Sequence, residues 1–395
     1  MHVLHWYSNL LHGGGVASAV AGVAGAQARQ GARVTIAAAE ADRHPLYEPM
    51  ALQAGVDLFA WSPTSAAHVG SQDLRVMARH DIARLRNSRP DVVHVHGEFS
   101  VDNLWVPRLF SCPVVVSPHG AFHPVVLRKS RRLAKRLYLA TEGPVVKRRV
   151  AAFHALTPME REHTTAIFPQ AKIYCAPQGA SPSFRALRAT DASERSPRKA
   201  TITLASVGRL DVFTKGLDLL LEAFSCAVSR APDADLRLIM VGPDWKQGRA
   251  WLEGRASELG ITHRVRFTGA LTGGEVAGVL AEANVYIQLS RHEGFPLSVV
   301  EALSSTMPAI LSDAIGTVSY PEIADLPHVM VVPPSAAEAA RAITAAAARL
   351  PDLSAAALSC RDRVRSFFSW ERAAGMHLDE YARLCVASPA NATPA

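Results

Sequence analysis

The segment Ser290-Arg291-His292-Glu293-Gly294-Phe295-Pro296-Leu297-Ser298-Val299-Val300-Glu301-Ala302 decides the fold class of this chain. It follows an apolar run at 284–289, which is typical of a buried strand, and it leads into a helical pattern at 296–305. Strand, tight loop and helix form the repeating unit of a parallel α/β sheet. The segment therefore predicts an α/β fold with a ligand beyond the carboxyl end of the strand, where open α/β sheets bind their ligands.

Two glutamates eight positions apart give this segment its chemistry. Gly294 and Pro296 predict a tight loop after Glu293 and the start of a helix that carries Glu301 about one and a half turns further on. The free N–H groups around 294–298 are suited to an anion. A carboxylate accepts hydrogen bonds from vicinal hydroxyls, so one glutamate can hold a ribose and the other a sugar. The spacing alone also fits two surface residues or a glycosidase acid/base pair, but the shared anion site favours a nucleotide sugar over the glycosidase.

The same alternation of short apolar runs and longer helical patterns extends along the whole chain. The predicted strands are 2–6, 33–38, 91–95, 113–117 and 153–156, and then 201–207, 236–241, 264–268, 284–289, 308–311 and 329–332. The predicted helices are near 15–30, 71–88, 130–142, 216–229, 247–260, 274–282, 296–305, 335–349 and 354–366. The pattern predicts two doubly wound parallel sheets, each a Rossmann-like α/β domain.

A stretch without periodicity, 177–200, lies between the two halves and is predicted to be a linker. We expect an N-terminal domain over 1–185 and a C-terminal domain over 200–368. Ser369 can cap a last amphipathic helix, 370–386, and Glu371 places an acid in its first turn. The final residues, 387–395, are expected to fray.

Composition excludes several classes of protein. With 395 residues, of which 49% are hydrophobic and 19% charged, the chain can bury large cores, so intrinsic disorder and a small disulfide scaffold are excluded. The five cysteines form no CxxC pair, which argues against a zinc cluster and a disulfide framework and favours a reducing cytoplasm. We find neither a signal-peptide pattern at the N-terminus nor an apolar run long enough for a membrane span.

Positive charge is concentrated in one segment. Residues 121–150 contain nine basic side chains and one acid, a local net charge of +8 in a chain whose formal charge is +7. No nucleic-acid-binding module accompanies it, so nucleic acid is not an expected partner. Within 128–138, Leu133, Leu137 and Tyr138 can enter a bilayer while the cations meet anionic lipid. The same stretch also fits a diphosphate-bearing acceptor or a solvated helix face.

The turn after the first strand is rich in glycine, in the order His12-Gly13-Gly14-Gly15. Glycines allow a phosphate to approach the start of the following helix closely, although a plain tight turn is an equal alternative. The turn is neither GxGxxG nor a Walker A loop, which argues against a dehydrogenase and a P-loop kinase. An esterase oxyanion loop would need a Gly-x-Ser-x-Gly elbow, and the sequence has none.

Two further strand ends carry polar side chains. His94-Val95-His96-Gly97 and Ser117-Pro118-His119-Gly120 follow neighbouring strands, and two such histidines together favour a polar wall beside a ligand over a purely structural role. The loop from Gly208 to Gly216 carries Arg209 and Lys215, a planar fork and a point charge that together suit a diphosphate. Taken alone, that pair fits surface solvation equally well.

Taken in order along the chain, these motifs resemble the large family 4 (group 1) of retaining GT-B glycosyltransferases. The resemblance rests on the E-x7-E spacing of Glu293 and Glu301, the glycine loop 13–15, Ser-Pro-His-Gly at 117–120, Gly-Arg-x5-Lys-Gly at 208–216, Phe-Thr-Gly at 267–269 and Ser-Trp-Glu-Arg at 369–372. It implies two Rossmann-like domains facing a cleft, an acceptor held by the N-terminal domain, and a nucleotide sugar held mainly by the C-terminal domain. It also implies that the last helix packs back on the N-terminal domain.

The resemblance assigns a role to each candidate residue. Arg209 and Lys215 stabilise the departing diphosphate, Glu293 contacts the donor sugar, Glu301 binds the ribose, and His119 contacts the sugar near the reacting centre. The backbone positions that approach the donor are Gly13, Gly14, Gly15, Gly269, Gly294, Phe295, Pro296 and Leu297. The resemblance implies neither a cofactor nor a metal, because two cations on the leaving group replace the ion that other transferases use.

One residue departs from this family pattern, and one short motif mimics a motif of another transferase architecture. In His-Gly-Ala-Phe-His-Pro at 119–124, His123 stands where a related subgroup has an acid, which affects acceptor or sugar specificity. Asp233-Ala234-Asp235 mimics the DxD metal motif of the other transferase architecture, but it precedes a strand, so we predict a turn.

The sequence predicts a cytoplasmic, metal-independent transferase that moves a hexose from a UDP- or GDP-sugar to a glycan, lipid-linked or small-molecule acceptor. Bacterial surface polysaccharide or lipid-linked oligosaccharide synthesis is the expected setting, with peripheral binding at the inner face of the cell membrane through 128–138. Three alternatives stay open: a natural-product glycosyltransferase, a GT-B sugar-nucleotide epimerase, and an inactive sugar-nucleotide-binding subunit.

Overall fold

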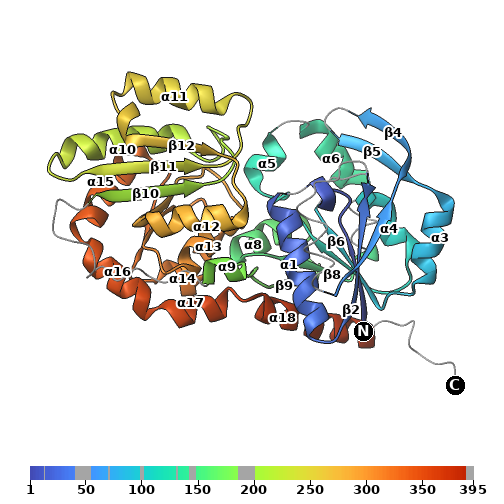
Figure 1. Ribbon diagram of the computed structural model, residues 1–395. Coiled ribbons are helices and arrows are strands. Elements are labelled where there is room, and N and C mark those ends of the chain that lie inside the picture. The colour runs from blue at the N-terminus through green and yellow to red at the C-terminus, as the bar shows by residue number, and fades with distance from the viewer. Residues whose placement is uncertain are drawn as a thin grey trace. The chain divides into compact units, whose positions relative to one another are not determined.

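The structure is a computed structural model that describes residues 1–12, 14–40, 55–69, 72–97, 102–129, 132–141, 148–185 and 201–387. The chain divides into two compact units, one formed by Met1–Gly179 with Ser369–Ala395 and the other by Ala180–Phe368. Each unit is built on a parallel β-sheet with helices on its faces (Figure 1). None of the described helices is long and apolar enough to cross a membrane.

The sheet of the first unit has seven strands in the order β3-β2-β1-β6-β7-β8-β9, and all neighbouring pairs are parallel. The strands are β1 His2–Trp6, β2 Arg33–Ala39, β3 Asp57–Trp61, β6 Val92–His96, β7 Val114–Ser117, β8 Ala152–Ala155 and β9 Ile173–Cys175, with a separate antiparallel pair β4 Pro63–Val69 and β5 Gln72–Met77. The helices include α1 Gly15–Arg29, α3 Arg79–Asn87, α4 Asp102–Leu109, α5 Pro124–Arg128, α6 Arg132–Thr141, α8 Pro158–Ile167 and α18 Trp370–Ala387. Fully buried strands, such as β1 and β7, are expected of a sheet covered on both faces.

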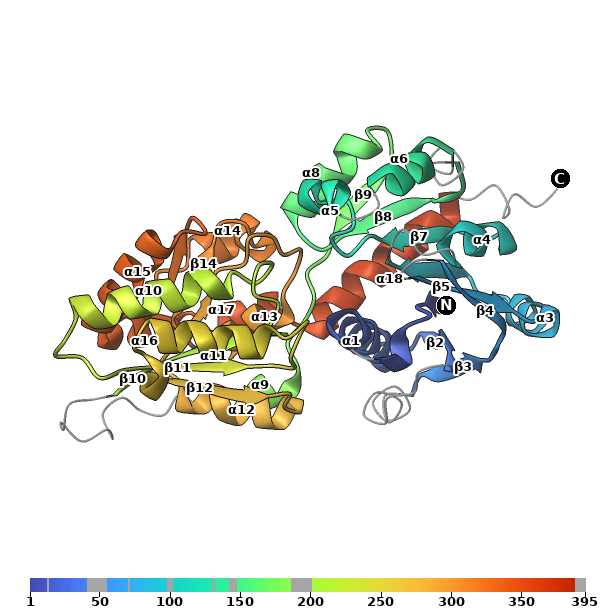
Figure 2. The same cartoon turned by 90° about the horizontal axis from the view of Figure 1, so that it is seen from above.

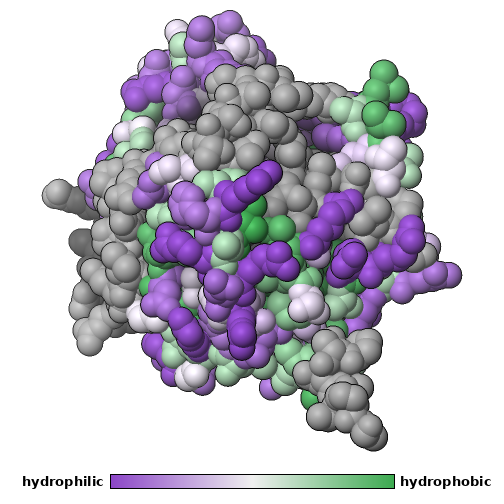
Figure 3. All heavy atoms as spheres, turned by 90° about the vertical axis from the view of Figure 1, so that its right-hand side faces the viewer, coloured by the Kyte–Doolittle hydropathy of each residue, from purple (hydrophilic) through white to green (hydrophobic). Residues whose placement is uncertain are grey.

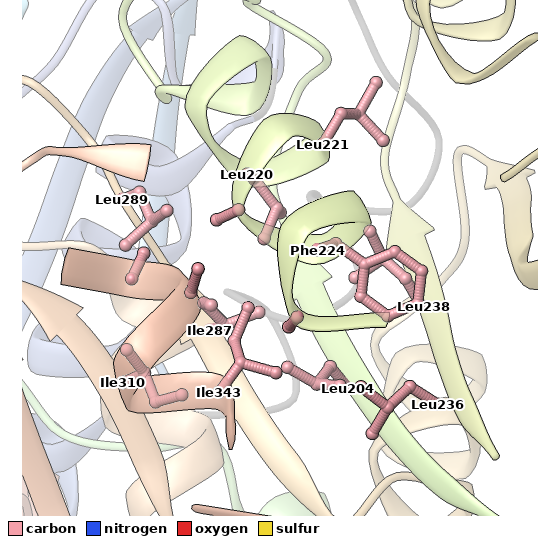
Figure 4. Packing of buried hydrophobic residues seen from close by; sticks show 14 of the residues in the cluster. Leu204, Leu220, Leu221, Phe224, Leu236, Leu238, Ile287, Leu289, Ile310 and Ile343 are labelled. Atoms are coloured by element: carbon pink, nitrogen blue, oxygen red, sulfur yellow. The ribbon is translucent and has the colours of Figure 1, made fainter. Parts of the chain in front are cut away.

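The second unit contains a six-stranded parallel sheet in the order β12-β11-β10-β13-β14-β15. Its strands are β10 Ile202–Val207, β11 Leu236–Val241, β12 Val265–Gly269, β13 Val285–Gln288, β14 Ala309–Ser312 and β15 Val329–Val332. Its helices are α9 Pro182–Arg185, α10 Leu217–Arg230, α11 Gly248–Glu258, α12 Gly273–Glu282, α13 Leu297–Ser304, α14 Pro321–Ala324, α15 Ala336–Ala348, α16 Leu350–Ser359 and α17 Arg361–Phe367. The apolar sides of α10 and α15 close one face of the sheet, where Phe224, Leu238 and Ile343 are buried together (Figure 4).

The last helix returns to the first unit. α18 packs against α1 (Figures 1 and 2), and its Trp370 ring occupies the space beside Gly22 of α1. A Cβ atom on Gly22 would lie 2.5 Å from the Trp370 ring, so this close approach requires glycine. The cap predicted for the helix is confirmed, because the Arg372 N–H donates to Ser369 Oγ at 3.1 Å.

The α/β alternation and the doubly wound fold class are confirmed, and every predicted strand is present within about two residues. The helix predicted near 71–88 is wrong in its first half, because 72–77 pair with 63–69 as a hairpin and only Arg79–Asn87 is helical. Pairing with a neighbouring segment outweighs local helix propensity there. The edge strands 57–61 and 173–175 were not predicted.

Two further predictions are corrected at 177–200 and 354–366. Residues 182–185 of the predicted linker form α9, where Phe184 is buried, whereas 186–200 lie outside the described residues. The helix predicted over 354–366 is divided at Cys360 into α16 and α17. The division allows Leu353 and Val364 to enter two different hydrophobic clusters. The tail from 388 also lies outside the described residues.

On the side of the first unit that Figure 3 shows, the coloured residues are predominantly hydrophilic. Helix α3 lies on this side of Figure 1, and its residues Arg79, Arg84 and Arg86 are exposed.

Candidate active site

The ends of strands β10 and β13 bring the two charged motifs of the second unit together. β10 pairs with β13, so the loops that follow them are neighbours. Lys215 Nζ lies 2.9 Å from Glu293 Oε2 and 3.0 Å from Oε1. Only 13% of the Lys215 side chain and 22% of the Glu293 side chain are exposed, so the pair is shielded from water on most sides. A half-buried pair of opposite charges at a strand edge is suited to bind a polar, charged ligand.

Glycines shape the loop that carries Lys215. Gly216 has φ +63°, and a Cβ atom there would lie 2.1 Å from the Leu289 carbonyl oxygen. Gly208 has φ +152°, and a Cβ atom there would lie 3.2 Å from Lys215 Cε. Both positions therefore require glycine, since any side chain would push the loop away from β13 or displace Lys215.

Arg209 is the second cation of this loop. Its guanidinium lies 4.7 Å from the centroid of the Trp245 ring and 3.4 Å from an Asp211 carboxylate oxygen, and 49% of the side chain is exposed. Ser206, Gly208, Arg209, Lys215, Met240 and Gln288 are among the residues that line a small pocket at this edge. The arrangement offers an anion one half-exposed guanidinium and one largely buried ammonium.

Glu301 lies in α13, one turn from its start. Burial raises the pKa of the Glu301 carboxyl to about 7. No residue in the described part of the chain donates a hydrogen bond to this carboxylate, whereas the nearby Tyr286 hydroxyl is bound to Gln288 Oε1 at 2.7 Å and lies 2.9 Å from Ser298 Oγ. A poorly solvated acceptor of this kind gains most from hydroxyl donors on a ligand.

The loop Gly294-Phe295-Pro296 joins Glu293 to α13, which begins at Leu297. Pro296 is the N-cap and no side chain bonds to the first N–H groups of the helix, as predicted for an anion site. Gly269 ends β12, on the far side of β11 from β10, and its carbonyl accepts from the Gly242 N–H at 2.9 Å.

One ion pair of this site was not predicted. The two guanidinium nitrogens of Arg291 lie 2.8 and 2.7 Å from the two carboxylate oxygens of Asp218, and the guanidinium lies 4.4 Å from the Phe213 ring centroid. This bidentate pair fixes the loop after β13 to the start of α10. The sequence offered no signal for it, because 73 residues separate the partners.

The other predicted residues lie in the first unit. Gly14 has φ +96° and is the N-cap of α1, and Gly14 and Gly15 are both exposed with open space at their Cβ positions. Gly13 lies outside the described residues. The described part of this turn therefore leaves the first N–H groups of α1 without a side-chain cap.

His119 adopts a left-handed backbone conformation, φ +51°, after β7. The buried Glu160 stabilises this turn, because its carboxylate accepts from the Gly120 N–H at 2.5 Å and from the Leu156 N–H at 2.7 Å. Burial raises the pKa of Glu160, and the two N–H donors oppose that shift. Glu160 was not predicted as a site residue, although Thr157-Pro158-Met159-Glu160 has the spacing of a capping box.

His119 ends a cluster of six histidines that the sequence only partly indicated. The rings of His5, His94, His96, His119, His154 and His377 lie near one another in the first unit. Burial lowers the pKa of His5 and His154 to about 4 and that of His119 to about 3. The imidazoles are therefore neutral at pH 7. The sequence places His94, His96 and His119 at or after the ends of neighbouring strands, but no sequence pattern links them to His377 in α18.

The basic segment forms a pocket of about 290 Å³ between α5, α6 and α8. Its walls combine apolar groups with cations: Phe122, Leu127, Leu139 and Ile167 with Arg128, Arg132, Lys135 and Arg136. On α6, Leu133 and Leu137 are 80% and 65% exposed. Ser130 and Arg131 lie outside the described residues.

The two details that depart from or mimic known motifs have local structural roles. His123 Nδ1 accepts from the Val125 N–H at 3.2 Å and so caps α5. Asp235 lies in a turn before β11, as predicted, and binds Arg237 and Arg264 at 3.1 Å each.

Two family models match the chain in succession. "Glycosyltransferase Family 4" matches residues 13–184 and "Glycosyl transferases group 1" matches residues 189–349. The two matches meet close to the division between the structural units.

Curated relatives and a solved structure agree with these matches. The chain is 29% identical over 297 residues to the GDP-mannose:cellobiosyl-diphosphopolyprenol alpha-mannosyltransferase of Komagataeibacter xylinus, covering 74% of this chain and 70% of that protein. It is 29% identical to the protein of the same name from Xanthomonas campestris, covering 56% of each chain. The sucrose-phosphate synthase of Thermosynechococcus elongatus has a similar fold, with a TM-score of 0.76, 19% identity and coverage of 98% of this chain and 100% of that one.

Proposed function

Since the chain belongs to the group 1, family 4 glycosyltransferases, we propose that it is a retaining enzyme that moves a hexose from a UDP- or GDP-sugar to an acceptor hydroxyl without a metal ion. The observation that carries the proposal is the Lys215–Glu293 pair, 2.9 Å apart, with Arg209 on the same loop. Two cations and a carboxylate at one edge of the sheet support binding of a diphosphate and its sugar.

Arg209 and Lys215 act on the leaving group. When the bond between the sugar C1 and the diphosphate oxygen breaks, the diphosphate leaves with the electron pair and its negative charge grows. An ammonium has three N–H donors, so Lys215 can stay hydrogen-bonded to Glu293 and still donate to a phosphate oxygen. The Arg209 guanidinium can move away from the Trp245 ring and donate two parallel hydrogen bonds to a phosphate. Two such cations supply the charge stabilisation that other transferases obtain from a metal.

The two glutamates bind hydroxyl groups of the donor. Glu301 accepts from the ribose hydroxyls, and Glu293, fixed by Lys215, accepts from a hydroxyl of the transferred sugar. The first N–H groups of α13 bind phosphate oxygens. The acceptor hydroxyl attacks C1 from the side that the diphosphate leaves, and its proton passes to a diphosphate oxygen, so configuration is retained without an enzyme nucleophile.

For the acceptor we propose a lipid-linked glycan, in bacterial surface polysaccharide or lipid-linked oligosaccharide synthesis. The names of two relatives contain a diphosphopolyprenol acceptor and GDP-mannose, so GDP-mannose is the first donor to test. The pocket of α5, α6 and α8 combines cations for a diphosphate with apolar walls for a lipid, and Leu133 and Leu137 are exposed beside it. Binding to the inner face of a membrane would bring the enzyme to such an acceptor.

The test is a donor panel with EDTA present. Thermal shift and nucleoside diphosphate release are measured with GDP-mannose, UDP-glucose, UDP-GlcNAc and UDP-galactose, because a ligand that binds the folded state raises its melting temperature. One donor is expected to stabilise the protein and to be hydrolysed slowly, and the Lys215→Ala variant is expected to lose the hydrolysis. A protein that no donor stabilises, or that needs a divalent ion for release, would contradict the proposal.

A further inference from the structure

Two files of hydrogen-bonded groups lie in the first unit. The first runs from the Ala176 carbonyl through His154, Ser117 and His94 to Tyr381. The second, here called the imidazole chain, runs from Gln27 through His5 and His96 to His119. The side chains of both files are buried except for His119, which is partly exposed. The imidazole chain therefore has one end at a buried amide and one end open to the surroundings.

In the first file, the backbone carbonyl fixes the direction of the donors. Ala176 O can only accept, so the proton of neutral His154 lies on Nε2, which is 2.9 Å away. His154 Nδ1 is then bare and accepts from the Ser117 hydroxyl at 2.6 Å. Ser117 Oγ in turn accepts from His94 Nε2 at 2.6 Å. His94 Nδ1 is then bare, and it accepts the hydroxyl proton of Tyr381 at 2.5 Å.

Gln27 fixes the direction of the imidazole chain. Its Oε1 lies 2.7 Å from His5 Nε2. An amide oxygen can only accept, so the proton of neutral His5 lies on Nε2. The Gln27 amide nitrogen is buried and has no hydrogen-bond partner among the described residues.

The same reasoning determines the remaining tautomers. His5 Nδ1 is bare and accepts from His96 Nε2 at 2.9 Å, and His96 Nδ1 accepts from His119 Nε2 at 3.1 Å. Each step requires a neutral ring, and burial lowers the pKa of all three histidines well below 7. His119 is left with a bare Nδ1.

We propose that Gln27, His5 and His96 are positioning residues that hold His119 as the Nε2–H tautomer, so that its Nδ1 accepts a hydrogen bond from a hydroxyl of the sugar or the acceptor. The last step rests on the proposed function, whereas the tautomer itself does not. Glu160 fixes the backbone of the same turn, so His119 is constrained in both position and protonation.

A metal ion is the competing interpretation of part of this cluster. Nitrogens of His5, His94 and His96 lie within 4.8 Å of one another. Both ring nitrogens of each of these histidines already have protein partners, at 2.5–3.1 Å. A metal would have to replace those bonds, so the hydrogen-bonded chain is favoured.

The direct test is the ¹⁵N spectrum of the full-length protein labelled at histidine, in which bare and protonated ring nitrogens differ in shift. His119 is assigned by the signals lost in His119→Asn. At neutral pH we expect Nε2 protonated and Nδ1 bare in His119 of the wild type. Protonation of Nδ1, or stoichiometric bound zinc or another transition metal in the purified protein, would overturn the proposal. This measurement needs no destabilising substitution.

Gln27→Met tests the coupling, with Gln30→Met as the matched control. Gln30 is the C-cap residue of the helix that contains Gln27, and its Nε2 donates to the Glu371 carbonyl at 2.7 Å. In Gln27→Met the His119 signals are expected to move toward a mixture of tautomers, and kcat/KM to fall about 2- to 10-fold, the effect of one hydrogen bond. Gln30→Met should match the wild type in both. An unchanged His119 spectrum in Gln27→Met would overturn the role of Gln27. If the tautomers are as expected but the protein binds no nucleotide sugar, the result contradicts the proposed function alone, and the tautomer assignment stands.

Discussion

The ammonium of Lys215 lies 2.9 Å from the carboxylate of Glu293, although 78 residues separate them in the sequence. Each residue follows a strand of the second sheet, and the two strands are hydrogen-bonded neighbours. The pair is shielded from water on most sides, so each side chain depends on the other for its orientation. Removal of either partner leaves a half-buried charge without its counterion.

We expect Lys215→Ala and Glu293→Ala each to lower turnover by about 100-fold or more, because each removes charge stabilisation of the transition state. The melting temperature should fall because the remaining charge loses its counterion, but the fold should stay intact, since both residues lie outside the hydrophobic clusters. Arg341→Ala is the control, because it removes a cation from a surface pair with Glu338 on α15. Turnover near the wild-type level in both site variants would contradict the assignment.

Glu301 should make donor binding depend on pH. Burial raises its pKa to about 7, so the carboxylate protonates as pH falls through 7 and loses acceptor capacity for the ribose hydroxyls. The donor KM is expected to rise as pH decreases from 8 to 6. Steady-state kinetics over this range test the effect. The Glu301→Gln variant should bind the donor more weakly, with a KM that does not change with pH. A flat wild-type profile would argue against a ribose contact at Glu301.

The basic pocket should act on the acceptor and leave donor binding unchanged. The double variant Arg132→Gln/Arg136→Gln is expected to raise the KM for a polyprenyl diphosphate acceptor several-fold and to weaken binding to anionic vesicles, since each cation near a charged surface contributes about 1 kcal/mol. Arg79→Gln/Arg86→Gln on α3 removes the same charge from another surface of the same unit. Equal effects of the two pairs would mean that net charge, and not this pocket, determines binding.

The histidine cluster should make the protein sensitive to acid. His5 and His154 have a pKa of about 4 when folded, against 6.5 when exposed, so the unfolded chain binds protons that the folded chain excludes. Stability is therefore lost as pH falls from about 6.5 to 4, by about 1.4 kcal/mol per pH unit for each excluded proton. Melting temperatures across this range test the slope. His80→Asn, at a largely exposed site, should leave the slope unchanged, and a flat curve for the wild type would contradict the burial of neutral rings.

The contact between α1 and α18 should tolerate no side chain at Gly22. Gly22→Ala places a Cβ atom 2.5 Å from the Trp370 ring and is expected to lower the melting temperature by several degrees. Gly254→Ala in α11 meets no atom within 4 Å and should be neutral or stabilising by about 0.5–1 kcal/mol. Thermal melts of the two variants distinguish a steric cost from a general effect of alanine. A Gly22→Ala protein as stable as the wild type would show that α18 shifts freely.

The sequence by itself determined the α/β class, the positions of eleven strands and the chemistry at the strand ends. Apolar periodicity is a local property, and polar residues that follow an apolar run must lie at the carboxyl edge of a parallel sheet. For this reason Arg209, Lys215, Glu293, Glu301 and His119 could be singled out before any contact was known. The pairing of 63–69 with 72–77 was not predicted, because a neighbouring strand overrides local helix propensity there. The break at Cys360 was not predicted, because packing partners far along the chain decide it.

Only the tertiary structure decided which of these residues meet. The order of strands placed Lys215 against Glu293, and the return of α18 placed Tyr381 and His377 among histidines from β1, β6 and β8. Burial then set the protonation of those rings and raised the pKa of Glu301. Solvent exclusion depends on the whole fold, so no local pattern in the sequence encodes it.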